Sequence, residues 1–345
     1  MRRKSYRITK VGSLNNLRLV EEELLPPSND EVTIEVKAIG LNFADVFTIL
    51  GLYKASPKID FIPGLEFSGV ITDKGKNVTG FSSGDKIIGV IRFGAYTTHI
   101  NIDHRYIIKL PAKWSFEEGA SFIVQALTAY YALVPLGNID KLQELVSQPI
   151  VLIHSAAGGV GIYANRIAKK FSAFTIGTIG SESKAGLLKS EGYDDVIVRN
   201  NNFKAELEKR LDGRMLDLVL DAVGGKIQKD SFDFLAPTGR LVSYGLSQFM
   251  SHGTSPNYFK LALQFLKMPR YQSLTLIESN KSVLGFNLIW LYERVNLMKG
   301  MLDEISSLHL NKPYVGKVFQ FDRFMQAIRE FQSGNTVGKV VVTVH

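Results

Sequence analysis

Between residues 15 and 110, short apolar runs alternate with turn-forming residues. Proline and glycine interrupt this stretch at Pro26-Pro27, Pro57, Pro63-Gly64 and Gly84-Asp85. The runs between these breaks are of β type: Glu31–Val36, Gly69–Thr72, Lys86–Val90 and Tyr106–Leu110. The pattern predicts a β-rich domain in this part of the chain.

The pattern changes near Phe116, where apolar positions recur at helical spacing as far as Leu133. Strand-like and helical segments then alternate. The predicted strands are Ile150–His154, Phe174–Ile179, Asp194–Val198, Leu216–Leu220 and Arg240–Tyr244. The predicted helices lie near Gly161–Phe171, Lys184–Glu191, Phe203–Leu211 and Gln228–Leu235. Such alternation of apolar strands with helices predicts a doubly wound parallel sheet.

The C-terminal part has a third pattern. A long helical periodicity runs from about Ser282 to Leu308, followed by the strand-like run Lys317–Phe321, a short helix and the strand Gly338–Val344. We expect this segment to return to the first domain.

Composition agrees with two folded domains. The chain has 345 residues, about twice the usual ~150-residue domain, and its 45% hydrophobic and 21% charged residues are typical of globular proteins. It has no cysteine, which excludes disulfides, thiolate metal sites and cysteine nucleophiles. Only carboxylates and six histidines are left as strong metal ligands. We therefore expect no metal site.

The net charge of +8 is spread along the chain without a long basic block. Such a charge could help to bind an anionic cofactor or a membrane surface, and it does not indicate nucleic acid. The basic start of the chain is followed by polar residues, and no uninterrupted apolar stretch reaches the ~18–20 residues of a spanning helix. These features predict a cytoplasmic protein without an integral membrane segment.

A glycine-rich turn follows the predicted strand Ile150–His154 and opens a helix. The turn reads Ala157-Gly158-Gly159-Val160-Gly161 after Ala156, which replaces the tight-turn glycine of the usual fingerprint. Gly158 and Gly159 let the backbone approach a pyrophosphate, and Gly161 permits close packing of helix and strand. The helix N-terminus adds N–H groups and a positive dipole, so we expect a bound dinucleotide.

The end of the next strand predicts which dinucleotide is bound. An acid at this edge would accept the ribose hydroxyls of NAD, whereas here the strand is followed by Gly180 and Ser181. Gly180 leaves room for a 2′-phosphate, Ser181 can donate to it, and Lys184 and Arg199 could supply positive charge. NADPH is therefore favoured, with Glu182 the one residue that argues for NAD and solvated surface positions the alternative for both cations.

Several motifs occur in an order typical of one superfamily. They are Gly40-Leu-Asn-Phe-Ala-Asp45, Pro63-Gly-Leu-Glu66-Phe-Ser-Gly69, Gly84-Asp85-Lys86, Leu127-Thr128-Ala-Tyr130, Ala156–Gly161, Asp221-Ala-Val223-Gly224-Gly225 and Gly239–Gly245. On these motifs the chain resembles the medium-chain dehydrogenase/reductases, in particular the zinc-independent quinone oxidoreductase branch. Gly137-Asn138, Gly285-Phe-Asn-Leu288 and Thr336-Val-Gly-Lys339 look most like the vesicle amine transport protein subgroup.

The resemblance implies a fold, an assembly and a cofactor wall. It implies a GroES-like β-rich catalytic domain from residues 1–127 and 280–345, with a Rossmann domain of residues 128–279 inserted, an active site in the cleft, and a homodimer. The residues it implies at the cofactor are Thr128, Val223, Gly224, Gly245, Leu246, Phe286, Asn287 and Leu288. Packing roles inside a helix or core are the alternatives for Thr128, Phe286 and Leu288.

Two departures from relatives in this superfamily bear on chemistry. The alcohol dehydrogenase branch has a histidine after the Pro-Gly motif and cysteines for zinc, whereas this chain has Leu65 there and no cysteine. A tyrosine common in the quinone oxidoreductase branch is Phe47 here, while a second one is kept as Tyr53. The resemblance therefore implies no zinc and a less polar pocket.

Without a Lewis acid, conjugated acceptors are the easiest substrates to reduce. Reduction of a quinone or an α,β-unsaturated carbonyl gives a delocalised oxyanion that ordinary hydrogen-bond donors can stabilise. We expect Asn42 near the nicotinamide or substrate oxygen, Tyr53 as a donor to the oxyanion and Asp45 as a positioning residue. A turn asparagine, a packed aromatic and a helix cap are the respective alternatives. We interpret Glu66, Asp85 and His154 as structural.

The leading hypothesis is thus an NADPH-dependent, zinc-independent reductase of a small quinone or conjugated carbonyl. One rival is a non-enzymatic protein of the vesicle-associated kind, with its basic surface on anionic lipid or RNA. A second rival is an enoyl-thioester reductase of the same superfamily. The large residues Phe43, Phe47 and Tyr53 near the pocket favour a flat, compact substrate.

Overall fold

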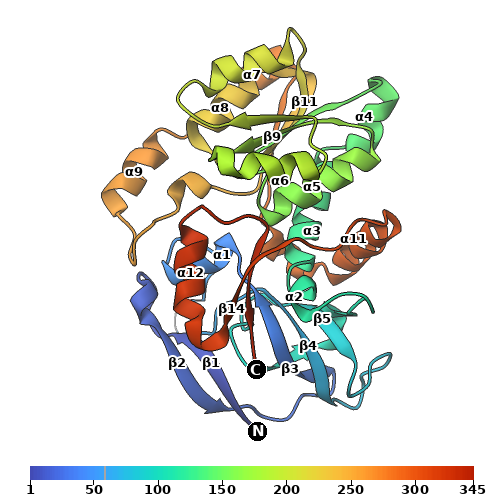
Figure 1. The fold of residues 1–345 in the computed structure, drawn as a ribbon, viewed down its shortest axis with the longest axis vertical. Helices are drawn as coiled ribbons and strands as arrows, with labels where there is room; N and C mark the ends of the chain where they lie inside the picture. Colours follow the sequence, from blue (N-terminus) through green and yellow to red (C-terminus); the bar gives the residue numbers. More distant parts are fainter. Residues whose placement is uncertain (58–59) are drawn as a thin grey trace.

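The computed structural model describes residues 1–57 and 60–345 and has two lobes, each built around its own β-sheet (Figure 1). The lower lobe in that view contains both chain termini, and the upper lobe contains the middle of the chain. The long apolar segment around α3 (Ile123–Tyr131) runs between them. The two-domain expectation from chain length is therefore reflected in the two sheets.

The lower lobe contains a seven-stranded sheet to which both ends of the chain contribute. Its order is β14-β15-β3-β4-β5-β7, and β6 pairs with the other part of β3. The bounds are β3 Glu31–Gly40, β4 Glu66–Lys74, β5 Lys86–Val90, β6 His99–Asp103, β7 Ile107–Lys109, β14 Val315–Gln320 and β15 Lys339–Thr343. Helices α1 Phe43–Ile49, α2 Phe116–Gly119 and α12 Phe324–Gln332 accompany it. The predicted return of the C-terminal strands to the first sheet is thus observed.

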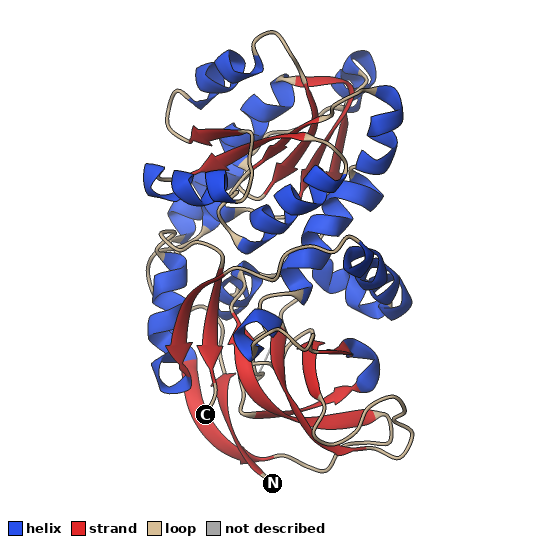
Figure 2. Ribbon diagram, turned by 45° about the vertical axis from the view of Figure 1, so that its right-hand side comes forward, coloured by secondary structure: helices blue, strands red, loops and turns tan. Residues whose placement is uncertain are grey.

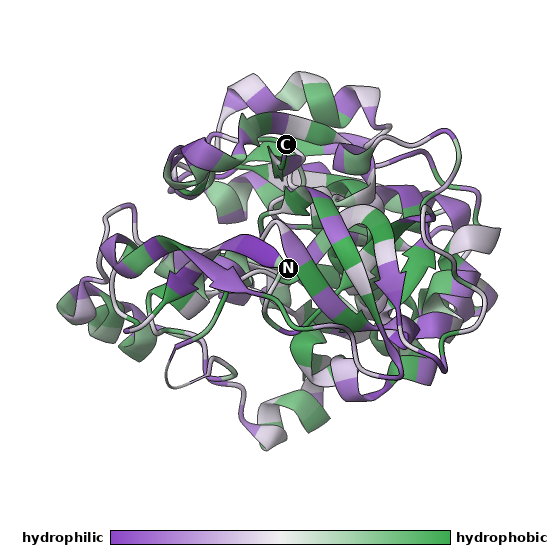
Figure 3. Ribbon diagram, turned by 90° about the horizontal axis from the view of Figure 1, so that it is seen from below, coloured by the Kyte–Doolittle hydropathy of each residue, from purple (hydrophilic) through white to green (hydrophobic). Residues whose placement is uncertain are grey.

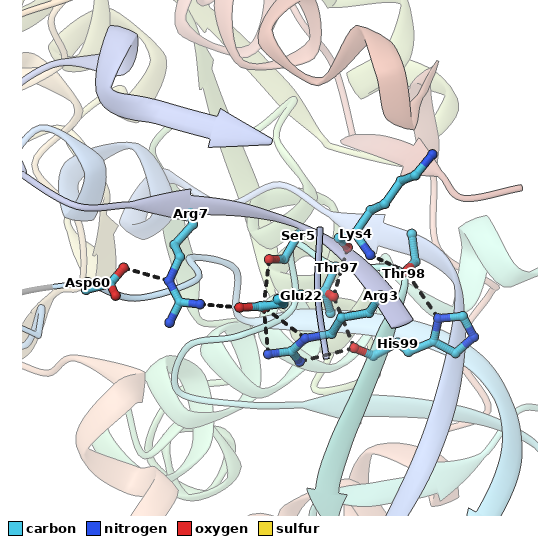
Figure 4. Close-up of polar contacts among 9 residues, drawn as sticks. All are labelled: Arg3, Lys4, Ser5, Arg7, Glu22, Asp60, Thr97, Thr98 and His99. Atoms are coloured by element: carbon cyan, nitrogen blue, oxygen red, sulfur yellow. Dashed lines mark hydrogen bonds and ion pairs between the residues drawn. The ribbon is translucent and has the colours of Figure 1, made fainter. Parts of the chain in front are cut away.

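A two-stranded hairpin, β1 Arg2–Ile8 and β2 Leu17–Glu23, lies beside this sheet. The half-buried carboxylate of Glu22 accepts hydrogen bonds from Arg3, Ser5 and Arg7, and Arg7 also binds Asp60 at 2.6 Å (Figure 4). The backbone N–H of Lys4 donates to the Thr98 hydroxyl at 3.0 Å. The hairpin is therefore joined to the rest of the lobe by polar contacts as well as by its apolar side. Figure 3 shows polar and apolar residues mixed along the strands at this end of the molecule.

The upper lobe contains a six-stranded parallel sheet with the order β10-β9-β8-β11-β12-β13. The bounds are β8 Ile150–Ile153, β9 Phe174–Ile179, β10 Asp195–Val198, β11 Leu216–Asp221, β12 Leu235–Ser243 and β13 Ser282–Gly285. Counted from β8, this is the 3-2-1-4-5-6 order of a Rossmann sheet. Its switch point lies between β8 and β11, and ligands of such sheets bind beyond the carboxyl ends of the strands at this point.

Helices cover both faces of the parallel sheet (Figure 2). They include α3 Ile123–Tyr131, α4 Ile139–Leu145, α5 Gly159–Lys170, α6 Ala185–Ser190, α7 Phe203–Leu211, α8 Gly225–Asp233 and α11 Val295–Ser307, with α9 Tyr258–Leu266 and α10 Ser273–Ser279 farther out. Along β8, Val151 and Ile153 pack into the core on the α3 and α5 side, and Ile150 and Leu152 into the core on the α7 side. Burial on both faces explains the uninterrupted apolar strands.

The C-terminal helical pattern from Ser282 to Leu308 is only partly correct. Its first residues form β13, which pairs with β12 in the parallel sheet. A short 3-10 segment, Leu288–Glu293, follows before α11 begins at Val295. The segment beyond residue 280 therefore first completes the upper sheet and then returns to the lower lobe. The expected domain boundary between residues 279 and 280 would separate β13 from the sheet to which it belongs. A four-residue strand is too short to show a period of its own.

The predicted helix from Phe116 to Leu133 consists of two helices, α2 and α3, and continues into a π-helical turn at Ala132–Leu136. Among the described residues, Phe116–Leu136 is the one helical stretch long and apolar enough to cross a membrane. Of its most apolar window, 72% is buried inside the fold. It therefore packs in this structure as a core segment between the sheets.

Candidate active site between the two sheets

A cavity of about 1180 Å³ lies between the lobes, with residues of both on its wall. Most of the predicted site residues line it: Asn42, Tyr53, Thr128, residues 157–161, Gly180, Lys184, Arg199, Gly245, Leu246 and residues 286–288. Four others lie off the wall: Asp45, Ser181, Val223 and Gly224. The fold thus brings predicted cofactor and catalytic residues to one cavity.

The fingerprint turn joins β8 to α5 at the switch point of the sheet. Gly158 is the N-cap of α5, so no side chain competes for the first-turn amides, which have no partner within a helix. A Cβ on Gly161 would lie 2.6 Å from the Ala156 backbone, which agrees with close packing of helix and turn. The Gly338 amide donates to Ala157 O at 2.7 Å, so the lower lobe contacts this turn directly.

Three of the predicted residues off the cavity wall make local contacts in the upper lobe. The Ser181 hydroxyl lies 2.9 Å from that of Ser183. The amides of Val223 and Gly224 donate to the buried Asp221 carboxylate at 2.9 and 3.1 Å. Gly224 has a φ of +83°, which favours glycine, and precedes α8. These contacts account for the residues structurally, and any cofactor role remains a prediction.

The residues at the end of β9 form an open edge with positive charge. A Cβ on Gly180 would meet nothing closer than Nη2 of Arg199, at 3.7 Å. Lys184 lines the same cavity, and burial together with the nearby Arg199 lowers the pKa of its ammonium. Glu182, the residue that argues for NAD, instead lines a separate small pocket. This edge therefore provides open space and two cationic side chains at the cavity, whereas its acidic residue, Glu182, lies at a different pocket.

Lys184 makes two contacts that were not predicted. Its Nζ donates to Gly334 O at 2.5 Å and to Thr336 O at 2.9 Å. These carbonyls lie between α12 and β15, so Lys184 connects the upper lobe to the lower one. Of the two predicted cations, Arg199 is thus the one whose contacts stay within the upper lobe.

Asn42, the N-cap of α1, belongs to a buried polar network at the cavity. Its Oδ1 accepts from Lys339 Nζ at 2.7 Å, and its Nδ2 donates to Glu66 Oε1 at 3.1 Å and Gly40 O at 3.3 Å. Lys339 and Glu66 form an ion pair with side chains 2% and 0% exposed. The other Glu66 oxygen accepts from the Val124 amide at 3.1 Å. Because both Nδ2 hydrogens are used, Oδ1 is the atom of this amide that can still accept a further hydrogen bond.

Lys339 is the functional candidate that the sequence reasoning missed. It lines the cavity beside Asn42, although it lies in a strand. The available signal was a lysine at the start of the apolar strand β15, together with Glu66 at the start of the buried strand β4. A buried lysine is rare unless it is paired, so each of these residues predicts a partner of opposite charge.

Asp45 lies behind Asn42 and not on the cavity wall. Its Oδ2 accepts from the Asn42 amide at 2.8 Å and from the Tyr96 hydroxyl at 2.9 Å, whereas Oδ1 has no hydrogen-bond partner among the described residues. Burial raises the pKa of Asp45 to about 7. This placement agrees with an indirect, positioning role and also with the capping alternative.

Tyr53 and Asn287 contact each other at the cavity wall. They were predicted separately, Tyr53 as a hydrogen-bond donor and Asn287 as a neighbour of the cofactor. The Tyr53 hydroxyl donates to Asn287 Oδ1 at 2.7 Å. Burial raises the pKa of the Tyr53 phenol to about 12. The phenol therefore stays protonated at neutral pH and can donate a hydrogen bond.

Much of the remaining wall is apolar. Leu65 lines the cavity at the position where the zinc-dependent branch has histidine, and Phe43 and Phe47 line it near Tyr53. Tyr258, Leu261 and Phe265 of α9 line it as well. Within residues 1–57 and 60–345, no group of three His, Asp or Glu side chains is placed to hold a metal. The cavity wall thus combines the positively charged edge at Gly180, of the kind that binds a dinucleotide, with an apolar region beside it.

Comparisons with known proteins agree with this architecture. The family profile of the alcohol dehydrogenase GroES-like domain matches residues 28–112, and that of the zinc-binding dehydrogenases matches residues 192–342. A synaptic vesicle membrane protein VAT-1 homolog of Danio rerio is 31% identical over 340 residues, covering 97% of this chain and 69% of the relative.

Solved structures agree as well. An Escherichia coli quinone oxidoreductase complexed with NADPH has a TM-score of 0.80 at 26% identity, covering 99% of this chain and all of that one. A CurK enoyl reductase has a TM-score of 0.82 at 28% identity, covering 99% of both chains. The predicted GroES-like and Rossmann architecture is therefore confirmed. Together, the profiles, the relative and the structures show that the chain belongs to the medium-chain dehydrogenase/reductase superfamily, with VAT-1 homologues among its relatives.

Proposed function

We propose that the protein is an NADPH-dependent, zinc-independent oxidoreductase that reduces a quinone or an α,β-unsaturated carbonyl compound. The observation that carries the proposal is the open Gly180 edge with Arg199 beside it, in the same cavity as Asn42 and Tyr53. The quinone oxidoreductase that resembles this chain is complexed with NADPH, which supports the choice of cofactor.

The residues present fit this cofactor. The first-turn amides of α5 would bind the pyrophosphate, and Arg199, with Lys184 nearby, would bind the 2′-phosphate. Thr128, residues 245–246 and residues 286–288 would line the remainder of the cofactor. NADPH would supply a hydride at the nicotinamide ring.

The chain's own residues would handle the charge that develops on the acceptor. The protonated Tyr53 phenol can leave Asn287 and donate to an oxyanion in the cavity, a contribution that preorganised donors make in other enzymes. The Lys339 ammonium lies at the same wall, where it is paired with Glu66 and held by Asn42. The apolar wall around Leu65 and Phe47 would exclude water.

An acceptor screen tests the proposal. NADPH and NADH oxidation would be followed with quinones, enones and an enoyl-CoA, with and without a chelator. We expect acceptor-dependent oxidation of NADPH, unaffected by the chelator, because Leu65 and the absence of cysteine leave no zinc site of the usual kind. Tight NADPH binding without turnover of any acceptor would contradict the enzyme function and favour a non-enzymatic vesicle-associated or RNA-binding protein.

An enoyl-thioester substrate is the second candidate. The apolar wall of the cavity continues along α9 through Tyr258, Leu261 and Phe265, beyond the residues assigned to the cofactor, and gives space for an acyl arm. The structural likeness to an enoyl reductase points in the same direction. In the screen, a kcat/KM for the enoyl-CoA above that of every quinone and simple enone would favour this candidate.

Assembly and location are also proposals. We propose a homodimer, the commonest closed assembly, in the cytoplasm. Light scattering at micromolar concentration tests the first proposal, and a monomer would contradict it.

A further inference from the structure

A chain of hydrogen bonds runs through the interior of the upper lobe and ends at Arg199. His154 follows β8, Thr178 lies on β9 and Ser231 on α8, and all three are fully buried. His154 Nδ1 lies 2.8 Å from Thr178 Oγ1, and Nε2 lies 2.9 Å from Ser231 Oγ. Arg199 Nη1 donates to Thr178 Oγ1 at 2.9 Å and to Thr178 O at 3.1 Å.

The contact of Ser231 at the other end of this chain determines which group donates and which accepts in each hydrogen bond. The Ser231 hydroxyl lies 2.8 Å from Ile227 O, and a carbonyl can only accept, so Ser231 donates there. Its oxygen then accepts from His154 Nε2–H, which leaves Nδ1 of the neutral ring as an acceptor. The Thr178 hydroxyl must therefore donate to Nδ1, and its oxygen is left to accept from Arg199.

A neutral His154 agrees with its surroundings. Burial, and after it the charge of Arg199, lower the pKa of His154 well below its usual value. A protonated ring would point N–H at Thr178 Oγ1 and compete with the guanidinium for it. The neutral ring instead turns the Thr178 hydroxyl so that its lone pairs face Arg199. With Nη1 held in this way, Nη2 is the guanidinium nitrogen beside Gly180.

We propose that His154 and Thr178 are positioning residues that hold the Arg199 guanidinium at the Gly180 edge and thereby set the preference for a ligand with a 2′-phosphate. The proposal rests on the proposed NADPH function and adds to it residues that never touch the ligand. It also gives His154 a role beyond the structural one that the sequence suggested.

The test is calorimetric binding of adenosine 2′,5′-bisphosphate and adenosine 5′-monophosphate, whose ratio of affinities isolates the 2′-phosphate. Thr178→Val removes the hydroxyl at nearly constant shape and should lower this ratio roughly three- to tenfold. Thr178→Ser keeps the hydroxyl and should restore the ratio. His154→Phe should act like Thr178→Val, and if it fails to fold, Thr178→Val decides.

A matched control lies on the same strand. Thr175 is equally buried on β9, but its hydroxyl donates to Asp194 at 3.2 Å, so Thr175→Val should leave the ratio unchanged. In an Arg199→Ala background, Thr178→Val should have no further effect on the ratio, because the group it positions is gone.

The outcomes separate the two proposals. If the unmodified protein binds both probes equally, the NADPH function fails, and this inference fails with it. If Arg199→Ala lowers the ratio but Thr178→Val does not, the cofactor assignment stands and the positioning chain is wrong. Equal losses in Thr178→Val and Thr175→Val would likewise overturn the inference, because the effect would then belong to the strand as a whole.

Discussion

The ammonium of Lys339 lies 2.7 Å from Oδ1 of Asn42, 297 residues away in the sequence. The same ammonium pairs with the fully buried carboxylate of Glu66. This network joins the last strand of the chain to β4 and to the N-terminus of α1. It therefore couples the shape of the cavity wall to the closure of the lower sheet.

Loss of Lys339 should destabilise the fold strongly. Lys339→Met leaves the Glu66 carboxylate buried without a counterion, so the free energy of unfolding should fall by about 3–5 kcal/mol. Adding Glu66→Gln should recover part of the loss. Urea denaturation at pH 7 measures both. Lys317→Met is the control, because its pair with Glu330 is exposed and should contribute less than about 1 kcal/mol. Equal losses in the two single variants would contradict this account.

Asp45 should make stability depend on pH in an unusual direction. Its folded pKa of about 7 lies above the usual value, so between pH 4 and 7 the folded state holds a proton that the unfolded state has lost. The contribution of Asp45 to stability is therefore greatest below about pH 4 and falls by up to about 1.4 kcal/mol per pH unit until about pH 7.

Asp45→Asn removes this titration and keeps an oxygen for the Asn42 amide and Tyr96. The unfolding free energy of the variant relative to the parent should thus rise as the pH increases from 5 to 7.5. Denaturation curves at several pH values measure it. A difference that stays constant over this range would mean that Asp45 titrates at an ordinary pKa.

Variants of Tyr53 and Asn287 distinguish a catalytic role of the Tyr53 hydroxyl from a purely structural contact between the lobes. If the phenol stabilises the oxyanion, Tyr53→Phe should lower kcat about 100-fold with little change in NADPH affinity. Asn287→Ala removes the acceptor of the phenol but keeps the phenol. Because Asn287 would also line the cofactor, its loss should lower NADPH affinity, whereas kcat at saturating NADPH should stay within about threefold.

Steady-state kinetics and fluorescence titration of NADPH provide the readouts for both variants. If both lowered kcat equally, Tyr53 would only hold the lobes together. Because the pKa of Tyr53 is about 12, the rate should show no ionisation of this phenol below about pH 10.

Gly180→Asp should reverse the cofactor preference. The new carboxylate would lie beside Arg199, repel a 2′-phosphate and accept ribose hydroxyls, so NADPH affinity should fall at least about tenfold while NADH affinity rises. Gly186→Asp places the same charge on α6, at an exposed position off the cavity wall, and should change neither affinity. Fluorescence titration checks both, and similar shifts in the two variants would mean that charge alone is responsible.

The parts of the site that depend on local sequence were predictable. The turn after β8 and the ends of β9 and β10 follow from the parallel sheet, since neighbouring parallel strands end at one edge. This is why Gly180 and Arg199 could be placed together from sequence. The short strand β13 could not be predicted, because four residues carry no period that competes with the helical pattern around them.

Contacts between segments far apart in the chain were beyond sequence reasoning. Lys339 with Glu66, and Tyr53 with Asn287, are each separated by more than 200 positions. The first pair depends on how the lower sheet closes, and the second on how the two lobes meet at the cavity. Lys184 illustrates the same limit. Its position near the cavity was foreseen from the strand, whereas its bonds to Gly334 and Thr336 require the lower lobe to lie against it.

The most direct test of the central claim is the affinity of the unmodified protein for NADPH and for NADH, measured by fluorescence titration under one set of conditions. With Arg199 at an open Gly180 edge and Glu182 away from the cavity, NADPH should bind at least about tenfold more tightly, the effect of one charge-assisted hydrogen bond to phosphate. Equal affinities, or tighter binding of NADH, would contradict the assignment of this edge.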